Sequence, residues 1–199
     1  MKALLYIITS ISVLVVPVQA QKNKIKVSED TYIEAGLSAR IPMGEKDSKN
    51  IKVFKSEGTD KQSRTGLLKF KIPGHIKSYK RVSLYLYVLV NRKDHIPNAM
   101  FNLNVFGVQN DEWSELKIIW DDRIKTGSLL GTKSIPQSFN KKRELVKIRL
   151  KIGAFKKLID KNRDTIVSLA LANTEFNKIN AVISTKERSM KQAAYLVIE

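Results

Sequence analysis

The chain has 199 residues and carries 36 lysine and arginine residues against 19 aspartate and glutamate residues, a formal net charge of +17. It contains no cysteine, which excludes disulfides, thiolate metal sites and a lipid anchor on an N-terminal cysteine. A strongly basic protein inside a cell suggests nucleic acid as its partner. A basic protein outside the cell suggests an acidic polymer instead, such as a polyuronate, a sulfated glycan or anionic lipid.

Residues 1–20 have the pattern of a secretory signal peptide. Lys2 supplies a positive start, and residues 3–18 are almost all apolar. Small residues at Val18 and Ala20 predict cleavage before Gln21, and hence a secreted, extracellular or periplasmic protein. An uncleaved anchor is the alternative, but the apolar run is shorter than the ~20 residues that a membrane span needs. No membrane span is expected after cleavage.

The rest of the chain has the pattern of an all-β protein. A basic lead-in over residues 21–29, expected to be loose, precedes a single domain over residues 30–199. Short segments recur there between Gly, Pro, Asn and Asp, which is typical of a β-sandwich or barrel. Strands are expected at residues 30–35, 50–55, 64–72, 82–91, 102–108, 117–120, 145–151, 165–172, 181–185 and 194–199. At most one short helix is expected, near residues 154–161.

Strict alternation in two of these segments predicts one buried and one outward face. In residues 64–72, Lys69 and Lys71 fall on the face opposite the apolar one. In residues 82–91, Tyr85 and Tyr87 do the same. Such outward faces can meet water or a ligand.

Groups able to carry catalysis are sparse. His75 and His95 each stand alone, without a partner at metal-ligand spacing, so neither predicts a metal site. The densest carboxylates fall within residues 111–122, beside Trp113 and Trp120, and we interpret them as turn caps. Acid–base work on a glycosidic bond is the alternative.

Two further possibilities remain open for site chemistry. Asp30, Glu34 and loop carboxylates offer the oxygen ligands that a structural calcium takes, although no EF-hand pattern is present and no cofactor is expected otherwise. A polysaccharide lyase using Tyr85 or Tyr87 as its base would need basic neighbours, which Lys69 and Lys71 supply only if their strands pair.

A set of motifs along the chain resembles the DNRLRE-type domain, also classed as carbohydrate-binding module family 96. In order, they are residues 30–33 (DTYI), 63–70 (SRTGLLKF), 82–88 (VSLYLYV), 105–108 (VFGV), 113–120 (WSELKIIW), 167–171 (VSLAL), 185–187 (TKE) and 195–198 (YLVI). The sequence departs from the family pattern in three places. Ile119 stands where the family has Thr, residues 121–124 replace Asn-Asn-x-Pro, and Thr185 begins the closing motif where the family has Ser.

The resemblance covers about residues 30–199 and implies a non-catalytic jelly-roll module of exported proteins. Such modules are often appended to polysaccharide lyases, and their characterised activity is binding of alginate, a polyuronate. The motif residues expected to be structural are Asp30, Trp113, Glu115, Trp120, Lys186 and Glu187. In this interpretation the tryptophans anchor a loop and Glu115 accepts backbone hydrogen bonds, the alternative being direct sugar stacking.

An acidic glycan is therefore the expected partner, with no specific nucleic acid and with polysaccharide-degrading enzymes as possible companions. Arginine pairs with a carboxylate through two donors and lysine as a point charge. The candidate ligand residues are Lys69, Lys71, Tyr85, Tyr87, Arg64, Arg40, Lys52, Lys55, Lys147 and Arg149. Solubility alone also explains outward basic residues. The alternatives for function are an extracellular structural or protein-binding sandwich and a polysaccharide lyase.

Overall fold

The computed structural model describes residues 22–58, 61–74, 76, 78–91, 98–122, 124–137, 142–161 and 165–199. The expectations for the signal segment, its cleavage position, His75 and His95 lie outside these residues. Within them, no helix has the length and apolar character to cross a membrane. In chain order the elements are β1 (Asn23–Lys26), β2 (Glu29–Glu34), η1 (Gly36–Ser38), α1 (Met43–Lys46), β3 (Asn50–Val53), β4 (Arg64–Lys71), β5 (Val82–Asn91), β6 (Met100–Val108), η2 (Trp120–Asp122), β7 (Thr126–Pro136), β8 (Glu144–Leu150), α2 (Ile152–Lys161), β9 (Ile166–Ala172), β10 (Asn180–Ser184) and β11 (Tyr195–Ile198).

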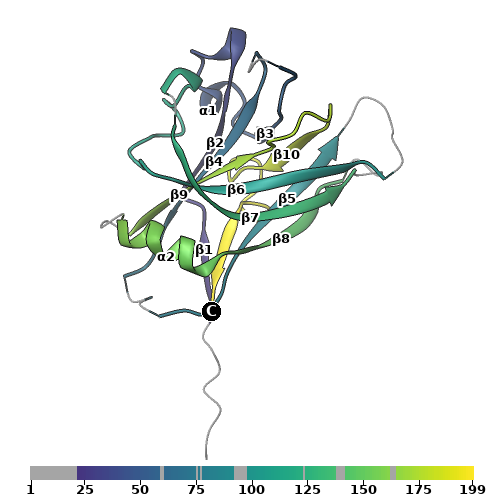
Figure 1. Cartoon of the computed structure of the whole chain (residues 1–199). Coiled ribbons are helices and arrows are strands. Elements are labelled where there is room, and N and C mark those ends of the chain that lie inside the picture. The colour runs from purple at the N-terminus through teal and green to yellow at the C-terminus, as the bar shows by residue number, and fades with distance from the viewer. Residues whose placement is uncertain are drawn as a thin grey trace, which may run out of the picture.

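The strands form two antiparallel sheets packed as a sandwich (Figure 1). In the six-stranded sheet, one edge of β5 pairs with β8, and the other edge pairs first with β11 and then with β10. The outer neighbours of β11 and β10 are β1 and β3. The five-stranded sheet has the order β2-β4-β9-β6-β7. The predicted all-β sandwich is confirmed.

Successive strands alternate between the sheets as a jelly roll does. Among the described strands, only the β6–β7 and β10–β11 connections stay within one sheet. The first and last described strands adjoin, because β1 pairs with β11 from Asn23 opposite Ile198 to Lys26 opposite Tyr195. In Figure 1 the purple β1 lies beside the yellow C-terminal strand. This long-range pairing joins both ends of the described chain into one sheet.

The core lies between the sheets and follows the predicted alternation. The inward residues of β5, from Val82 to Val90 at every second position, are buried, as are Leu68 and Phe70 of β4. Phe155 of α2 joins the same core. Burying such side chains provides most of the stabilisation of a domain without disulfides, at roughly 2 kcal/mol each.

Several local expectations differ from the structure. The basic segment at residues 21–29, which was expected to lack regular structure, contains the edge strand β1. In this strand Ile25 is buried between exposed Lys24 and Lys26. The strand expected at residues 117–120 is absent, because this segment runs as a turn into η2.

Strand β7 was not predicted, because it is a mostly exposed edge strand in which apolar residues do not alternate regularly with polar ones. Its pairing with β6 is also interrupted by irregular register beside Phe106. The helix expected near residues 154–161 begins two residues earlier, at Ile152, and the four-residue α1 is an additional short helix.

Candidate functional site

The outer face of the five-stranded sheet is covered by the segment between β6 and β7. Trp113 and Ile118 of this segment pack on Ile33, Leu67 and Ala170, which project outward from β2, β4 and β9. These residues form a second apolar cluster outside the main core. The indole Nε1 of Trp113 donates to Oγ of Ser168 at 3.1 Å, which anchors the segment on β9.

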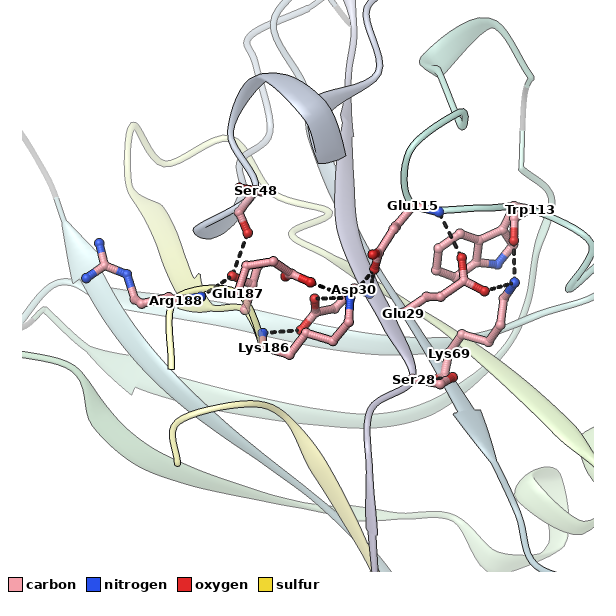
Figure 2. A network of polar contacts seen from close by, with 11 residues as sticks. Ser28, Glu29, Asp30, Ser48, Lys69, Trp113, Glu115, Lys186, Glu187 and Arg188 are labelled. Carbon is pink, nitrogen blue, oxygen red and sulfur yellow. Dashed lines mark hydrogen bonds and ion pairs between the residues drawn. The ribbon is translucent and has the colours of Figure 1, made fainter. Parts of the chain in front are cut away.

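Covering this face buries Lys69. Its side chain is 10% exposed, and its ammonium donates to Glu29 at 2.7 Å and to the carbonyl of Trp113. The same ammonium lies 4.6 Å from the centroid of the Trp113 ring. Figure 2 shows Lys69 directed toward these two residues. Lys69 is on the outward face as predicted, but it is enclosed by the protein and is not available to a ligand.

The motif residues meet in one polar network that joins three distant segments (Figure 2). The backbone N–H of Asp30 donates to Glu115 at 3.0 Å, and that of Glu115 donates to Glu29 at 2.9 Å. The backbone N–H of Lys186 donates to Asp30 at 2.9 Å, and its ammonium binds Glu115 and Glu187. The network clamps the loop after β6 and the loop after β10 onto β2. Trp120 lies on the second apolar cluster rather than in this network.

Three carboxylates of this network, those of Asp30, Glu115 and Glu187, have oxygens within 4.8 Å of one another. The ammonium of Lys186 lies among them, 3.7 Å from Oδ1 of Asp30. A positive charge of the protein's own therefore already occupies the position that a cation would take. Glu34, the other residue considered for calcium, pairs instead with Arg64 at 2.9 Å.

Asp30 is the most perturbed group of the network. Its side chain is fully buried, and Oδ1 accepts no hydrogen bond. Burial raises the pKa of Asp30 to about 7, against the lowering effect of the backbone N–H and the charge of Lys186. The carboxylates around Lys186 in turn raise the pKa of its ammonium, although burial opposes this.

The raised pKa predicts the pH dependence of stability. The pKa of Asp30 is about 7 in the folded protein and 3.8 in the unfolded chain. Its contribution to the free energy of unfolding is therefore fully present below pH 3.8 and is lost as the pH rises through 7. Urea unfolding of the protein and of Asp30→Asn should therefore differ by an amount that falls across this window, on the order of a few kcal/mol. A difference that grows with pH would mean that pairing with Lys186 outweighs burial.

The outer face of the six-stranded sheet carries cations around stacked tyrosines. Two cross-strand rows run over β1, β11, β5 and β8. The first row is Lys26, Tyr195, Tyr85 and Lys147, and the second is Lys24, Val197, Ser83 and Arg149. We call the following residues the cationic tyrosine face: Lys24, Lys26, Tyr85, Lys147, Arg149 and Tyr195.

The two tyrosines of this face stack on each other. Their ring centroids are 4.8 Å apart and their planes differ by 5°. The Lys24 ammonium lies 3.9 Å from the centroid of Tyr195, and that of Lys147 lies 5.7 Å from the centroid of Tyr85. Tyr85 was expected on an outward face as a candidate ligand residue. Its ring faces Tyr195 on one side and Lys147 on the other, so only its edges and the surrounding cations are presented to solvent.

The cations of this face have no carboxylate partner among the residues that the structure describes. Lys24, Lys26, Lys147 and Arg149 are all exposed and form no ion pair there. Burial raises the pKa of Tyr195, so its phenol keeps its proton near neutral pH and remains a hydrogen-bond donor. The face therefore offers unneutralised positive charge together with a hydroxyl donor.

The other predicted ligand residues lie elsewhere or are already paired. Arg40 pairs with Asp121 at 3.3 Å, Lys52 with Asp47 at 2.7 Å, and Arg64 with Glu34. Lys71 is exposed at the end of β4, and Lys55 is half-buried just after β3.

Because β4 and β5 belong to different sheets, Lys69 and Lys71 do not share a face with Tyr85 and Tyr87. The lyase arrangement that needed this pairing is therefore not formed. Tyr87 lies on the same sheet face as Tyr85, opposite Leu145 of β8.

Sequence reasoning missed Lys24, Lys26 and Tyr195 as candidate ligand residues. Alternation of polar and apolar residues in β1 and β11 was the available signal, since Ile25, Leu196 and Ile198 are buried between them. The pairing of these two strands at opposite ends of the chain carries no local signature.

Comparison with protein-family models identifies one family for this chain. The family model for carbohydrate-binding module family 96 matches residues 21–199, nearly the whole chain. No curated protein matches the chain.

Proposed function

Because the chain belongs to carbohydrate-binding module family 96, we propose that it binds an acidic polysaccharide, such as the polyuronate alginate, through the cationic tyrosine face. A polyuronate carries one carboxylate per sugar, which matches a surface of closely spaced ammonium and guanidinium groups. In this proposal the protein is exported and acts without catalysis.

The observation that carries the proposal is the contrast between the two outer faces of the sandwich. On the five-stranded sheet, the loop after β6 covers the surface, and the central cation Lys69 is neutralised by Glu29. On the six-stranded sheet, Lys24, Lys147 and their neighbours are exposed and have no carboxylate partner among the described residues. Unneutralised charge held on rigid strands favours binding of a polyanion.

Affinity electrophoresis tests this function directly. Gels containing alginate, pectate or heparin should retard the protein at low salt, and a gel with a neutral glucan measures retardation that does not depend on charge. Release of counterions should weaken the polyuronate retardation steeply between about 50 and 200 mM salt. The absence of retardation by every acidic polysaccharide would refute the proposal. Equal retardation with duplex DNA would show that only charge is recognised.

The non-catalytic part of the proposal has its own measurement. Lyase cleavage of a polyuronate produces unsaturated ends that absorb ultraviolet light, so prolonged incubation with alginate or pectate should leave the absorbance unchanged. A steady increase that disappears in Tyr85→Phe would instead assign a catalytic role to this face.

A further inference from the structure

A hollow lies on the opposite side of the sandwich from the cationic tyrosine face. It has a volume of about 570 Å³ and opens within the segment that covers the five-stranded sheet. Its apolar part is formed by Trp113, Ile118 and Ile124, which belong to the second apolar cluster. Its polar part includes Gln109 and Glu112. We call this hollow the loop cleft.

The loop cleft is held in shape by hydrogen bonds within its own segment and by one to β9. The backbone N–H of Glu112 donates to Asn110 at 3.0 Å, and that of Ile119 donates to Asp122 at 2.9 Å. The indole of Trp113 is fixed by Ser168. A concave site with an apolar floor, a few convergent polar groups and a fixed shape is typical of small-molecule binding sites.

The side chains at the rim are free to bind a ligand. In the part of the chain that the structure describes, the Gln109 amide, the Glu112 carboxylate and the Lys125 ammonium make no hydrogen bond or ion pair. Asp122 uses one carboxylate oxygen for the backbone of Ile119. These amide and carboxylate groups accept and donate hydrogen bonds in the pattern that sugar hydroxyls require.

The described rim of this cleft carries more carboxylates than cations, unlike the cationic tyrosine face. Among the lining residues that the structure describes, Glu112 and Asp122 contribute two carboxylates and Lys125 contributes one ammonium. An acidic sugar would therefore be repelled here, although the protein as a whole is strongly basic. A neutral pyranose presents an apolar ring face to the floor and hydroxyl groups to the rim.

We infer that the loop cleft binds a neutral saccharide unit, independently of the polyuronate proposed for the cationic tyrosine face. The module then has two glycan sites on opposite faces, one for an acidic polysaccharide and one for a neutral saccharide. Such a module could bridge an acidic polysaccharide and a neutral one.

Two-dimensional NMR of the full protein tests this inference. Neutral oligosaccharides with glucose, xylose, mannose or N-acetylglucosamine units should be titrated, with oligouronate as the charged comparison. At least one neutral oligosaccharide should shift the amide signals of residues 109–125 and the Trp113 indole signal. Double substitution Gln109→Ala and Glu112→Ala should weaken this binding about tenfold. Both residues are exposed, so the variant should fold.

A matched variant separates this inference from the proposed function. Lys24→Glu with Lys147→Glu should leave neutral-sugar binding unchanged while weakening polyuronate binding. The inference is overturned if no neutral oligosaccharide shifts the loop signals, if the Gln109 and Glu112 substitutions have no effect, or if oligouronate displaces the neutral sugar. Each of these results leaves the polyuronate measurement interpretable on its own.

Discussion

Charge reversal at Lys24 and Lys147 is expected to lower the affinity for a polyuronate about 100-fold, because each charged hydrogen bond lost is worth on the order of 1.5 kcal/mol or more. The two lysines lie on opposite sides of the stacked tyrosine pair, one on β1 and one on β8. Their reversal removes two cations and places two carboxylates beside the ligand. Titration by calorimetry at low salt measures the change.

The control must change the net charge by the same amount elsewhere. Lys46 and Lys117 are exposed away from this face, on α1 and in the loop after β6 that α1 contacts. Reversal of both should lower the affinity only a few-fold, through the general field of the protein. Equal losses in the two double variants would mean that the protein binds through a diffuse basic surface and not through the cationic tyrosine face.

Replacement of Lys69 by Met should lower the stability of the protein strongly and leave its polyuronate affinity unchanged, unlike the charge reversal at Lys24 and Lys147. The substitution leaves the Trp113 carbonyl and one oxygen of Glu29 without their donor. Breaking a largely buried pair of this kind costs about 3 kcal/mol. Urea unfolding measures the loss, and the polyuronate affinity of the folded variant should match that of the unmodified protein.

Lys71→Met on the same strand provides the matched comparison, since Lys71 is exposed. Its effect on the free energy of unfolding should stay within about 0.5 kcal/mol. A weakened polyuronate affinity in the folded Lys69 variant, with little loss of stability, would restore Lys69 as a ligand residue and contradict its assignment to the clamp.

The alternation in β4 and β5 was readable from the sequence, but the environment of their outward faces was not. Lys69 and Tyr85 occupy equivalent outward positions in the pattern. They differ because a loop about forty residues further along the chain folds over β4, as Trp113 contacting Lys69 shows. Whether an outward face meets solvent depends on such tertiary packing. The alternation of polar and apolar residues within a strand carries no information about it.

The partners of Tyr85 illustrate the same limit. Sequence reasoning placed Tyr85 on an outward face and named both Tyr85 and Lys147 as candidates, and the structure puts them opposite each other. It did not find Tyr195 or Lys24, because β1 and β11 are joined only by pairing between the two ends of the chain. The motif residues Asp30, Glu115, Lys186 and Glu187 were named from the family resemblance, whereas their shared network required the folded structure.

The most direct test of polyuronate recognition is to map the signals of a ¹⁵N-labelled protein during titration with a defined oligouronate. The account predicts that the shifted amides cluster on β1, β5, β8 and β11, with the largest changes beside Lys24, Tyr85 and Tyr195. Shifts confined to the five-stranded sheet and its covering loop, with β1 and β8 unchanged, would contradict it.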